Sequence, residues 1–287
     1  MANRHFGSIA DVWKHAVLVE VLERESPARY AETHAGSGGY ALTHDGERKF
    51  GILRFLQVAP RFPLLAQSRY RAITAFYAGS DRDLYPGSAV QAMIVLGNVS
   101  SYLLCDLDPE SVADLHRWSR ELDVHNCEVA ERDGMAAVAA WLDGESRASR
   151  LVHVDPFNAH ERGPAGHSAL ELAARVADSG AGLVYWYGYD EPSTEPQAQA
   201  ELAGLTRMPL WCGELTVTGA DDSPGDPGDH GVRPATFGMI LANVRVSTAD
   251  ACAAVGNALA SAYAGATLPD GTQGNLAFTS GTSAGRP

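Results

Sequence analysis

Near its N-terminus the chain reads Ala28-Arg29-Tyr30-Ala31-Glu32-Thr33-His34-Ala35-Gly36-Ser37-Gly38-Gly39. The first five of these residues are typical of a buried strand, and three glycines follow in the next seven. Because glycine has no Cβ, such a loop lets a ligand approach the backbone closely. Ligands of open α/β sheets bind at the carboxyl ends of strands, so this segment predicts an α/β fold with a site at the end of its first strand.

Six further short runs with β-branched or aromatic residues follow, most of them separated by helix-length segments. They cover residues 101–106, 127–130, 151–155, 182–187, 210–218 and 237–243. Strands that alternate with helices predict a mostly parallel sheet covered on both faces. Segment 219–234 is rich in Gly, Pro and Asp and cannot supply a crossover helix, so the last two strands are predicted to be antiparallel. This segment is expected to be either a mobile lid over bound substrate or a surface loop without a role.

The first two predicted strands are separated by an insertion at about residues 41–98. The insertion is too long for a single crossover and its pattern is helical, so we expect a small helical subdomain above the C-terminal edge of the sheet. The whole chain, 1–287, is predicted to form one domain, because single α/β domains of this size are common.

Polar residues follow the predicted strands at their carboxyl ends. Asp106 ends the second strand, Asp133 and Gly134 follow the third, and Asp155 ends the fourth. A glycine loop surrounded by carboxylates predicts a nucleoside-binding site, with Asp106 placed to bind ribose hydroxyls. No helix N-terminus motif for a pyrophosphate follows Gly39, which favours S-adenosylmethionine over a dinucleotide.

The composition excludes several classes of protein. Hydrophobic residues make up 45% and charged residues 20%, and no apolar run approaches the ~20 residues of a spanning helix. The first residues lack the apolar core of a secretory signal, so we expect a cytoplasmic protein with no membrane partner. The four cysteines form no Cys-x-x-Cys motif, so they are predicted to be buried thiols, and no metal site is expected.

The charge of the chain argues against a large RNA-binding surface. The formal net charge is −13, whereas proteins that hold RNA normally need a basic footprint on the phosphates. Segment 41–84 differs, because seven Lys or Arg residues against four Asp or Glu residues give it a charge of +3. This segment is either a solvated helical face or a small substrate-facing patch.

Taken together, these motifs resemble the bacterial family of 23S ribosomal RNA adenine-N6 methyltransferases. That family combines the motifs H-A-G-N-x-A-D-V-x-K-H, D-T-H-A-G-x-G-x-Y, Y-P-G-S and D-P-P-Y. The matching segments here are residues 5–15, 32–40, 85–88 and 155–158, and the similarity extends to 238–240 in the last predicted strand. The resemblance implies a Rossmann-like class I methyltransferase that uses S-adenosylmethionine and releases S-adenosylhomocysteine. Its sheet is expected to have seven strands, mostly parallel, with an antiparallel last strand.

The resemblance also implies roles for individual residues. The predicted cofactor-binding residues are His15, His34, Gly36, Gly38, Ser88, Asp106, Asp133 and Gly134. Asp155 and the carbonyl of Pro156 are predicted to be catalytic, because they would accept hydrogen bonds from the amino group that is methylated. Lys14, Phe157 and Asn158 are assigned to the substrate side.

The departures from the family motifs fall on the substrate side. The catalytic motif reads Asp155-Pro156-Phe157-Asn158, the Tyr-Arg-His lead-in to the first motif is missing, and a Trp-Tyr-Pro segment has become Trp186-Tyr187-Gly188. We therefore expect an N-methyltransferase for a small nitrogen-containing molecule, in a specialised biosynthetic pathway. The alternatives are the ribosomal RNA adenine methyltransferase of the family and an inactive paralogue that binds the cofactor. The sequence predicts no oligomeric state.

Overall fold

The computed structural model describes residues 6–44, 46–81, 83–144, 148–157, 160, 162–164, 166–189, 197–218, 235–267 and 273–286. Asn158 and segment 219–234, to which the sequence assigns a substrate contact and a lid or loop, lie outside these residues. No helix in the described ranges has the length and apolar character needed to cross a membrane.

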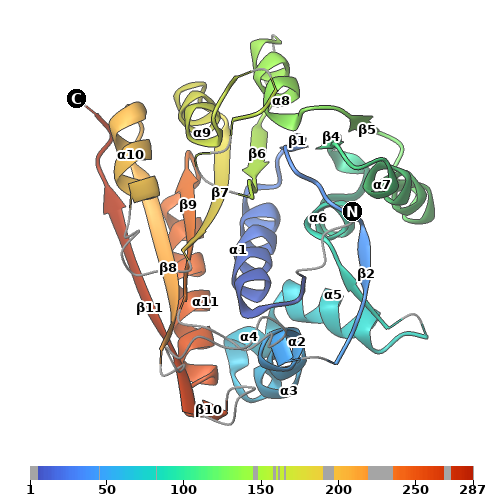
Figure 1. Cartoon of the computed structure of the whole chain (residues 1–287), viewed down its shortest axis with the longest axis vertical. Coiled ribbons are helices and arrows are strands. Elements are labelled where there is room, and N and C mark those ends of the chain that lie inside the picture. The colour runs from blue at the N-terminus through green and yellow to red at the C-terminus, as the bar shows by residue number, and fades with distance from the viewer. Residues whose placement is uncertain are drawn as a thin grey trace.

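The centre of the fold is a nine-stranded sheet in the order β10-β11-β8-β9-β7-β6-β1-β4-β5 (Figure 1). Its strands are β1 (Arg29–Glu32), β4 (Ser101–Asp106), β5 (Cys127–Glu131), β6 (Arg150–Val154), β7 (Gly182–Tyr189), β8 (Leu210–Thr218), β9 (Ala235–Ala242), β10 (Ala266–Thr267) and β11 (Gln273–Ser283). The five strands from β7 to β5 are parallel, and β9 is antiparallel to both β7 and β8. The predicted Rossmann-like arrangement and the antiparallel β8–β9 pair are confirmed.

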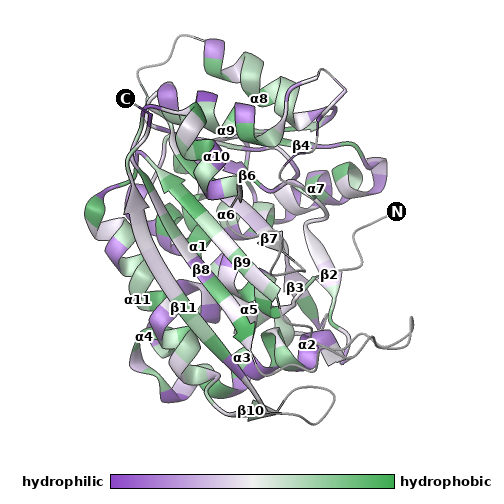
Figure 2. Ribbon diagram, turned by 60° about the vertical axis from the view of Figure 1, so that its left-hand side comes forward, coloured by the Kyte–Doolittle hydropathy of each residue, from purple (hydrophilic) through white to green (hydrophobic). Residues whose placement is uncertain are grey.

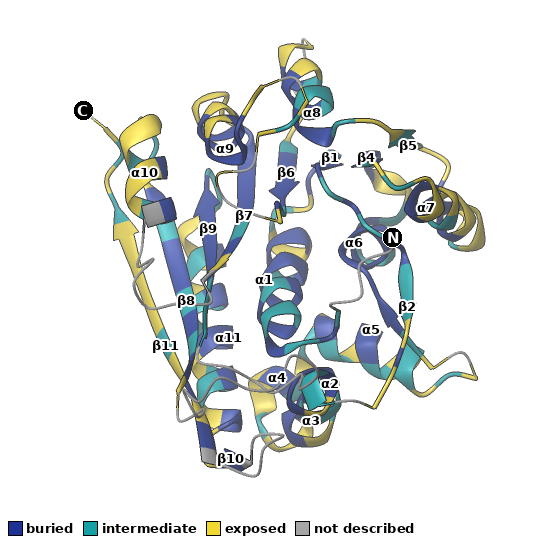
Figure 3. Cartoon of the chain, in the orientation of Figure 1, coloured by how far each residue is buried: buried dark blue, intermediate teal, exposed yellow. Residues whose placement is uncertain are grey.

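The predicted count of seven strands is too low, because β10 and β11 extend the sheet beyond β8. β11 pairs with β8 over nine residues. It carries few apolar residues and most of it is exposed at the edge of the sheet (Figure 3). Its partner strand supplies the hydrogen bonds that hold it, so a search for apolar runs does not detect it.

Helices cover both faces of the sheet, as expected. One face carries α1 (Ile9–Glu25), α6 (Ser88–Leu96), α7 (Pro109–Glu121) and α11 (Val246–Ala262); the other carries α8 (Gly134–Asp143), α9 (Ala169–Asp178) and α10 (Gln197–Leu205). Successive residues of a strand contribute to opposite faces, as Val184 and Tyr185 of β7 do. The central strands are hydrophobic and buried (Figures 2 and 3).

The predicted insertion is mostly helical. It contains α2 (Gly46–Phe50), α3 (Ile52–Val58), a 3₁₀ turn (Ala59–Arg61), α4 (Pro63–Gln67) and α5 (Arg69–Ala78). The small sheet of β2 (Gly39–Ala41) and β3 (Leu84–Pro86) links these helices to the glycine loop, and a second 3₁₀ turn (Gly97–Val99) follows α6. Phe50, Phe55 and Tyr70 pack into the same hydrophobic core as α1. The insertion is therefore built directly onto α1, below the carboxyl ends of the parallel strands in Figure 1.

A capping box sets the start of α1. The Ser8 hydroxyl accepts a hydrogen bond from the Asp11 N–H at 3.3 Å, and Asp11 Oδ2 accepts one from the Ser8 N–H at the same distance. Such reciprocal capping satisfies N–H groups that have no partner within the helix. It fixes where α1 begins and thereby which side of the helix carries Lys14 and His15.

Candidate functional site

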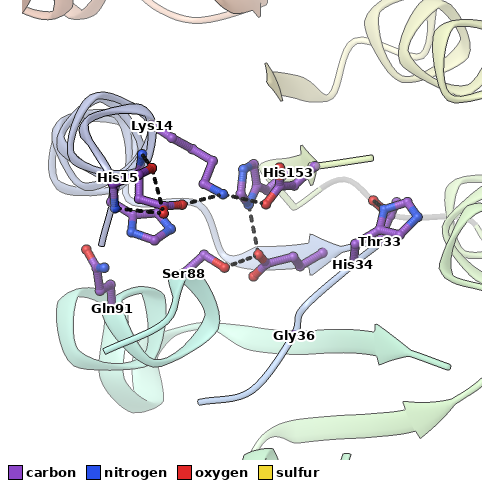
Figure 4. A network of polar contacts seen from close by, with 12 residues as sticks. Lys14, His15, Thr33, His34, Gly36, Ser88, Gln91 and His153 are labelled. Atoms are coloured by element: carbon purple, nitrogen blue, oxygen red, sulfur yellow. Dashed lines mark hydrogen bonds and ion pairs between the residues drawn. The ribbon is translucent and has the colours of Figure 1, made fainter. Parts of the chain in front are cut away.

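The structure brings six of the predicted site residues together around one cleft. Its wall includes Lys14 and His15 of α1, His34 and Gly36 of the loop after β1, Ser88 at the start of α6, and Asp155 after β6. These segments are far apart in the sequence and meet at the wall of the cleft (Figure 4). The cleft therefore joins the predicted cofactor side to the predicted catalytic side.

Asp106 organises the glycine loop. Gly36 has a φ of +58°, a conformation that side-chain-bearing residues rarely adopt, and its N–H donates to Asp106 Oδ2 at 2.8 Å. Asp106 Oδ1 accepts from the Asp108 N–H, also at 2.8 Å. The carboxylate thus clamps the loop to the end of β4. Each oxygen keeps a second lone pair for a ligand hydroxyl.

Gly38 lies further along the loop and is not among the residues that line the cleft. A Cβ on Gly38 would lie 2.3 Å from Trp118 Cδ1 of α7. Its N–H donates to Asp114 Oδ2 at 3.0 Å. The structure therefore gives Gly38 a packing reason to be glycine, in addition to the ligand approach that the sequence suggests.

Asp133 and Gly134 lie where α8 meets the end of β1. The Asp133 carboxylate caps α8 by accepting from the Met135 N–H at 3.0 Å. A Cβ on Gly134 would come within 1.9 Å of the Thr33 carbonyl oxygen, so only glycine fits there. This close approach places the first turn of α8 beside the glycine loop, where the adenine contact is predicted.

Lys14 and Asp155 form the charged centre of the cleft. Lys14 Nζ lies 2.8 Å from Asp155 Oδ2 and 3.1 Å from Asp11 Oδ1, and it packs over the Trp186 ring. Burial alone would raise the pKa of Asp155, but the charges of Lys14 and His153 and the hydrogen bond from Lys14 outweigh it and lower that pKa. Burial alone would lower the pKa of Lys14, but its two carboxylate partners raise it. Asp155 is therefore ionised at neutral pH and can act as a hydrogen-bond acceptor.

His15 belongs to a buried chain of ring side chains. Its Nδ1 lies 2.6 Å from the Tyr85 hydroxyl, which is 3.1 Å from the Tyr70 hydroxyl. Burial and the neighbouring charge of Lys14 lower the pKa of His15 well below its ordinary value. A neutral imidazole at this position offers the cleft polarity without a second positive charge.

Phe157 and Pro156 differ sharply in their surroundings. Pro156 is buried, whereas the Phe157 side chain is 95% exposed. An aromatic ring that is exposed two residues after Asp155 is available for stacking. Its predicted contact with substrate stays a prediction, as do the roles of the other site residues.

The basic insertion is used partly for internal contacts. Arg48 is buried with its guanidinium 4.2 Å from the Phe6 ring, Arg54 lies over the Tyr263 ring, and Arg71 donates to the Ala66 carbonyl. Arg71 therefore makes a contact within the insertion, whereas Arg48 and Arg54 contact rings in the rest of the fold.

His153 is a residue near the site that the sequence reasoning missed, and its partner is Glu32, the last residue of β1 before the glycine loop. The His153 Nδ1 atom lies 2.9 Å from Glu32 Oε1, and both side chains are fully buried beneath Ser88. His153 could have been identified from the sequence, because it is a histidine inside the apolar run 151–155 and stands two residues before Asp155.

Comparison with known proteins now identifies the family. The family model described as ribosomal RNA large subunit methyltransferase D, RlmJ, matches residues 25–267. The chain belongs to this family. It is similar to ribosomal RNA large subunit methyltransferase J of Escherichia coli, with 32% identity over 161 residues, or 53% of this chain and 56% of that protein. The Haemophilus influenzae protein of the same name is 31% identical over 161 residues, which again are 53% of this chain and 56% of that protein. The chain thus spans about half the length of these curated relatives.

A solved structure shows the same fold. Protein LPL1258 of Legionella pneumophila matches with a TM-score of 0.76 at 21% identity, and the match covers 96% of this chain and 98% of that one. The family match begins at Glu25, the last residue of α1, so Lys14 and His15 lie outside it, and the roles that the resemblance implies for them stay predictions.

Family membership corrects the substrate class expected from the sequence. The preference for a small nitrogen-containing molecule is wrong, because the matching family and both relatives are described as ribosomal RNA methyltransferases. The net charge of −13 misled the interpretation, since a whole-chain charge does not report the charge at one cleft. The alternative given with it, ribosomal RNA, is the reading that the comparisons support.

Proposed function

We propose that this chain is an S-adenosylmethionine-dependent methyltransferase that acts on the N6 amino group of an adenine in 23S ribosomal RNA. The observation that carries the proposal is the single cleft that joins the glycine loop to Asp155 in a member of this family. A cofactor at the glycine loop and a base at Asp155 would meet within that cleft.

The residues around the glycine loop fit S-adenosylmethionine. Asp106 offers lone pairs to ribose hydroxyls, and the positive φ of Gly36 leaves the loop backbone open to the ligand. Asp133 and Gly134 border the expected position of the adenine ring. When bound, the cofactor supplies a methyl group on a positively charged sulfur.

Asp155 is proposed to orient the target amino group. Among the described residues its carboxylate is bonded to Lys14 through Oδ2, which leaves Oδ1 to accept an N–H of the adenine. The Pro156 carbonyl is the proposed second acceptor. Two acceptors fix both amino hydrogens and direct the nitrogen lone pair at the methyl carbon, and such positioning lowers the barrier to transfer.

Phe157 is proposed to hold the base by stacking. Its ring is exposed and follows Asp155 by two residues in the sequence, and stacking of a base on an aromatic ring contributes about 1–3 kcal/mol. This would replace the tyrosine that ends the D-P-P-Y motif of the family.

The test is transfer of labelled methyl groups into protein-free 23S ribosomal RNA from cells that lack this modification. We expect labelled N6-methyladenosine among the digested nucleosides, and no incorporation with Asp155→Ala. The rate should fall steeply with added salt, because RNA binding depends on phosphate contacts. Failure of wild-type protein to label this RNA, under conditions where it binds S-adenosylhomocysteine, would reject the proposed substrate.

A further inference from the structure

A buried polar cluster lies beneath the cleft, formed by Glu32 and the groups that bond to it. Glu32 of β1 and His153 of β6 are register partners on adjacent parallel strands. Their side chains have 0% exposure, and His153 Nδ1 lies 2.9 Å from Glu32 Oε1. Ser88 of α6 and His153 of β6 both bond to the carboxylate oxygen Oε1 of Glu32, which lies between them (Figure 4).

The Glu32 carboxylate is surrounded by donors. Oε2 accepts from the Tyr30 hydroxyl at 3.0 Å, and Oε1 accepts from both His153 Nδ1–H and the Ser88 hydroxyl. A carboxylate oxygen accepts in each of these bonds, so each of the three neighbours donates.

This arrangement determines what Ser88 can offer to a ligand. A serine hydroxyl has one proton and two lone pairs. The proton of Ser88 is committed to Glu32, and Ser88 lines the cleft. The hydroxyl therefore presents only lone pairs to a ligand, which must approach with a hydrogen-bond donor.

His153 is a costly residue for packing alone. Its Nε2 atom is buried and has no hydrogen-bond partner among the described residues. A buried, unpaired polar atom costs stability, and a hydrophobic side chain would fill the same space without that cost. The structure thus points to a task for His153 other than filling the core.

We propose that His153 is a positioning residue that, through Glu32, makes Ser88 a hydrogen-bond acceptor for the ammonium group of the cofactor. This inference rests on the proposed function, which assigns the ribose to Asp106 and the adenine ring to Asp133. The amino-acid end of the ligand then extends to the other side of the glycine loop, toward Ser88. Its ammonium group is the donor that an acceptor-only hydroxyl selects.

Removal of His153 should free the Ser88 hydroxyl. His153 and Ser88 bond to the same oxygen, Glu32 Oε1, so without His153 the carboxylate is no longer held against Ser88. The proton of Ser88 is then free to point into the cleft. Ser88 would present a donor where the ligand also has one, and the preference for the ammonium group would be lost.

The experiment compares two ligands by calorimetry: S-adenosylhomocysteine and its analogue in which hydrogen replaces the α-amino group. Wild-type protein should bind S-adenosylhomocysteine at least about tenfold more tightly than the analogue, as a charge-assisted hydrogen bond provides. His153→Leu should reduce this ratio to near one. His153→Asn, whose Nδ2 can occupy the position of the imidazole Nδ1, should restore most of it.

Two further variants separate this role from general damage. Tyr30→Phe removes the donor to Oε2, the oxygen of Glu32 that Ser88 does not contact, so we expect the ratio to stay within about twofold of wild type. Ser88→Ala should lose the ratio even with His153 intact, so the inference remains testable if His153→Leu does not fold. A loss of stability alone would weaken both ligands equally and leave their ratio unchanged.

An unchanged ratio in folded His153→Leu or in Ser88→Ala would overturn the inference, as would a wild-type protein that does not distinguish the two ligands. The proposed function fails separately, when the ratios behave as expected but ribosomal RNA is not methylated. No binding of S-adenosylhomocysteine by the wild type would overturn both.

Discussion

Lys14 of α1 and Asp155 of the proposed catalytic segment, 141 residues apart in the sequence, form an ion pair with 2.8 Å between Nζ and Oδ2. The pair ties the helix that covers the cleft to the residue that is proposed to receive the adenine. Because the same lysine also contacts Asp11, it is held from two sides. Lys14 therefore controls both the charge of Asp155 and the position of its carboxylate.

Lys14→Met should impair catalysis most at low pH. The ion pair lowers the pKa of Asp155, so its removal raises that pKa and the acid limb of the profile of kcat/KM against pH should move to higher pH. The measurement is methyl transfer to 23S ribosomal RNA between pH 5 and 9. Lys49→Met, at an exposed position on α2, is the matched control. Identical acid limbs in the two variants would contradict this role of Lys14.

The same variant should lose stability at neutral pH, by about 1–3 kcal/mol for a buried charge left without its partner. Since the folded-state pKa of Asp155 is depressed, the contribution of the pair is present above the unfolded pKa and is lost as the pH falls through the folded pKa. Urea unfolding at pH 7 and at pH 3 checks this. The difference in free energy of unfolding between wild type and variant should be smaller at the lower pH. A difference that does not change with pH would argue against the ion pair as its source.

Asp106→Ala should weaken S-adenosylhomocysteine binding by about 1.5–3 kcal/mol, the contribution of hydrogen bonds to a charged group. The change also releases the Gly36 N–H, so the loop itself loses its anchor. Asp106→Asn retains one acceptor oxygen, so its calorimetric affinity for S-adenosylhomocysteine should lie between those of the wild type and Asp106→Ala. Asp143→Ala, which removes an exposed partner of Arg175, should bind as the wild type does. Full affinity in Asp106→Ala would rule out the ribose contact.

Gly134→Ala should destabilise the protein by about 1–3 kcal/mol, because the new methyl group overlaps the Thr33 carbonyl and must be accommodated by moving α8. Gly204→Ala provides the contrast: its Cβ would meet nothing within 4 Å, and alanine in a helix is favoured over glycine by about 0.5–1 kcal/mol. The denaturant midpoints of Gly134→Ala and Gly204→Ala are compared. Equal midpoints would show that the contact between Gly134 and the Thr33 carbonyl does not fix the position of α8.

The sequence predicts those parts of the site that follow from strand ends. Gly36, Asp106 and Asp155 could be placed in one region because the carboxyl ends of parallel strands meet at one edge of the sheet. The pairing of Glu32 with His153 could not be predicted, since it depends on the register between β1 and β6 across 121 residues. The reason for glycine at position 38 also depends on tertiary structure, because Trp118 packs against it.

Phe157→Ala should separate substrate binding from stability. The ring is 95% exposed, so its removal should change the free energy of unfolding by no more than about 0.5 kcal/mol. If the ring stacks on the target adenine, the same change should lower kcat/KM for 23S ribosomal RNA by a factor that corresponds to the loss of about 1–3 kcal/mol of stacking free energy. The affinity for S-adenosylhomocysteine should stay constant. Phe157→Tyr keeps an aromatic face and should retain most activity.

The matched control is Phe76→Ala, which removes another exposed phenylalanine, 69% accessible on α5. If a general loss of exposed aromatic surface explained the effect, both alanine variants would lose the same activity. Stacking at the proposed site instead requires that Phe157→Ala alone is impaired, because Phe157, unlike Phe76, belongs to segment 155–158, which matches the D-P-P-Y motif. Wild-type kinetics in Phe157→Ala would mean that the base is held by other groups and that the aromatic function of the D-P-P-Y motif has not passed to this residue.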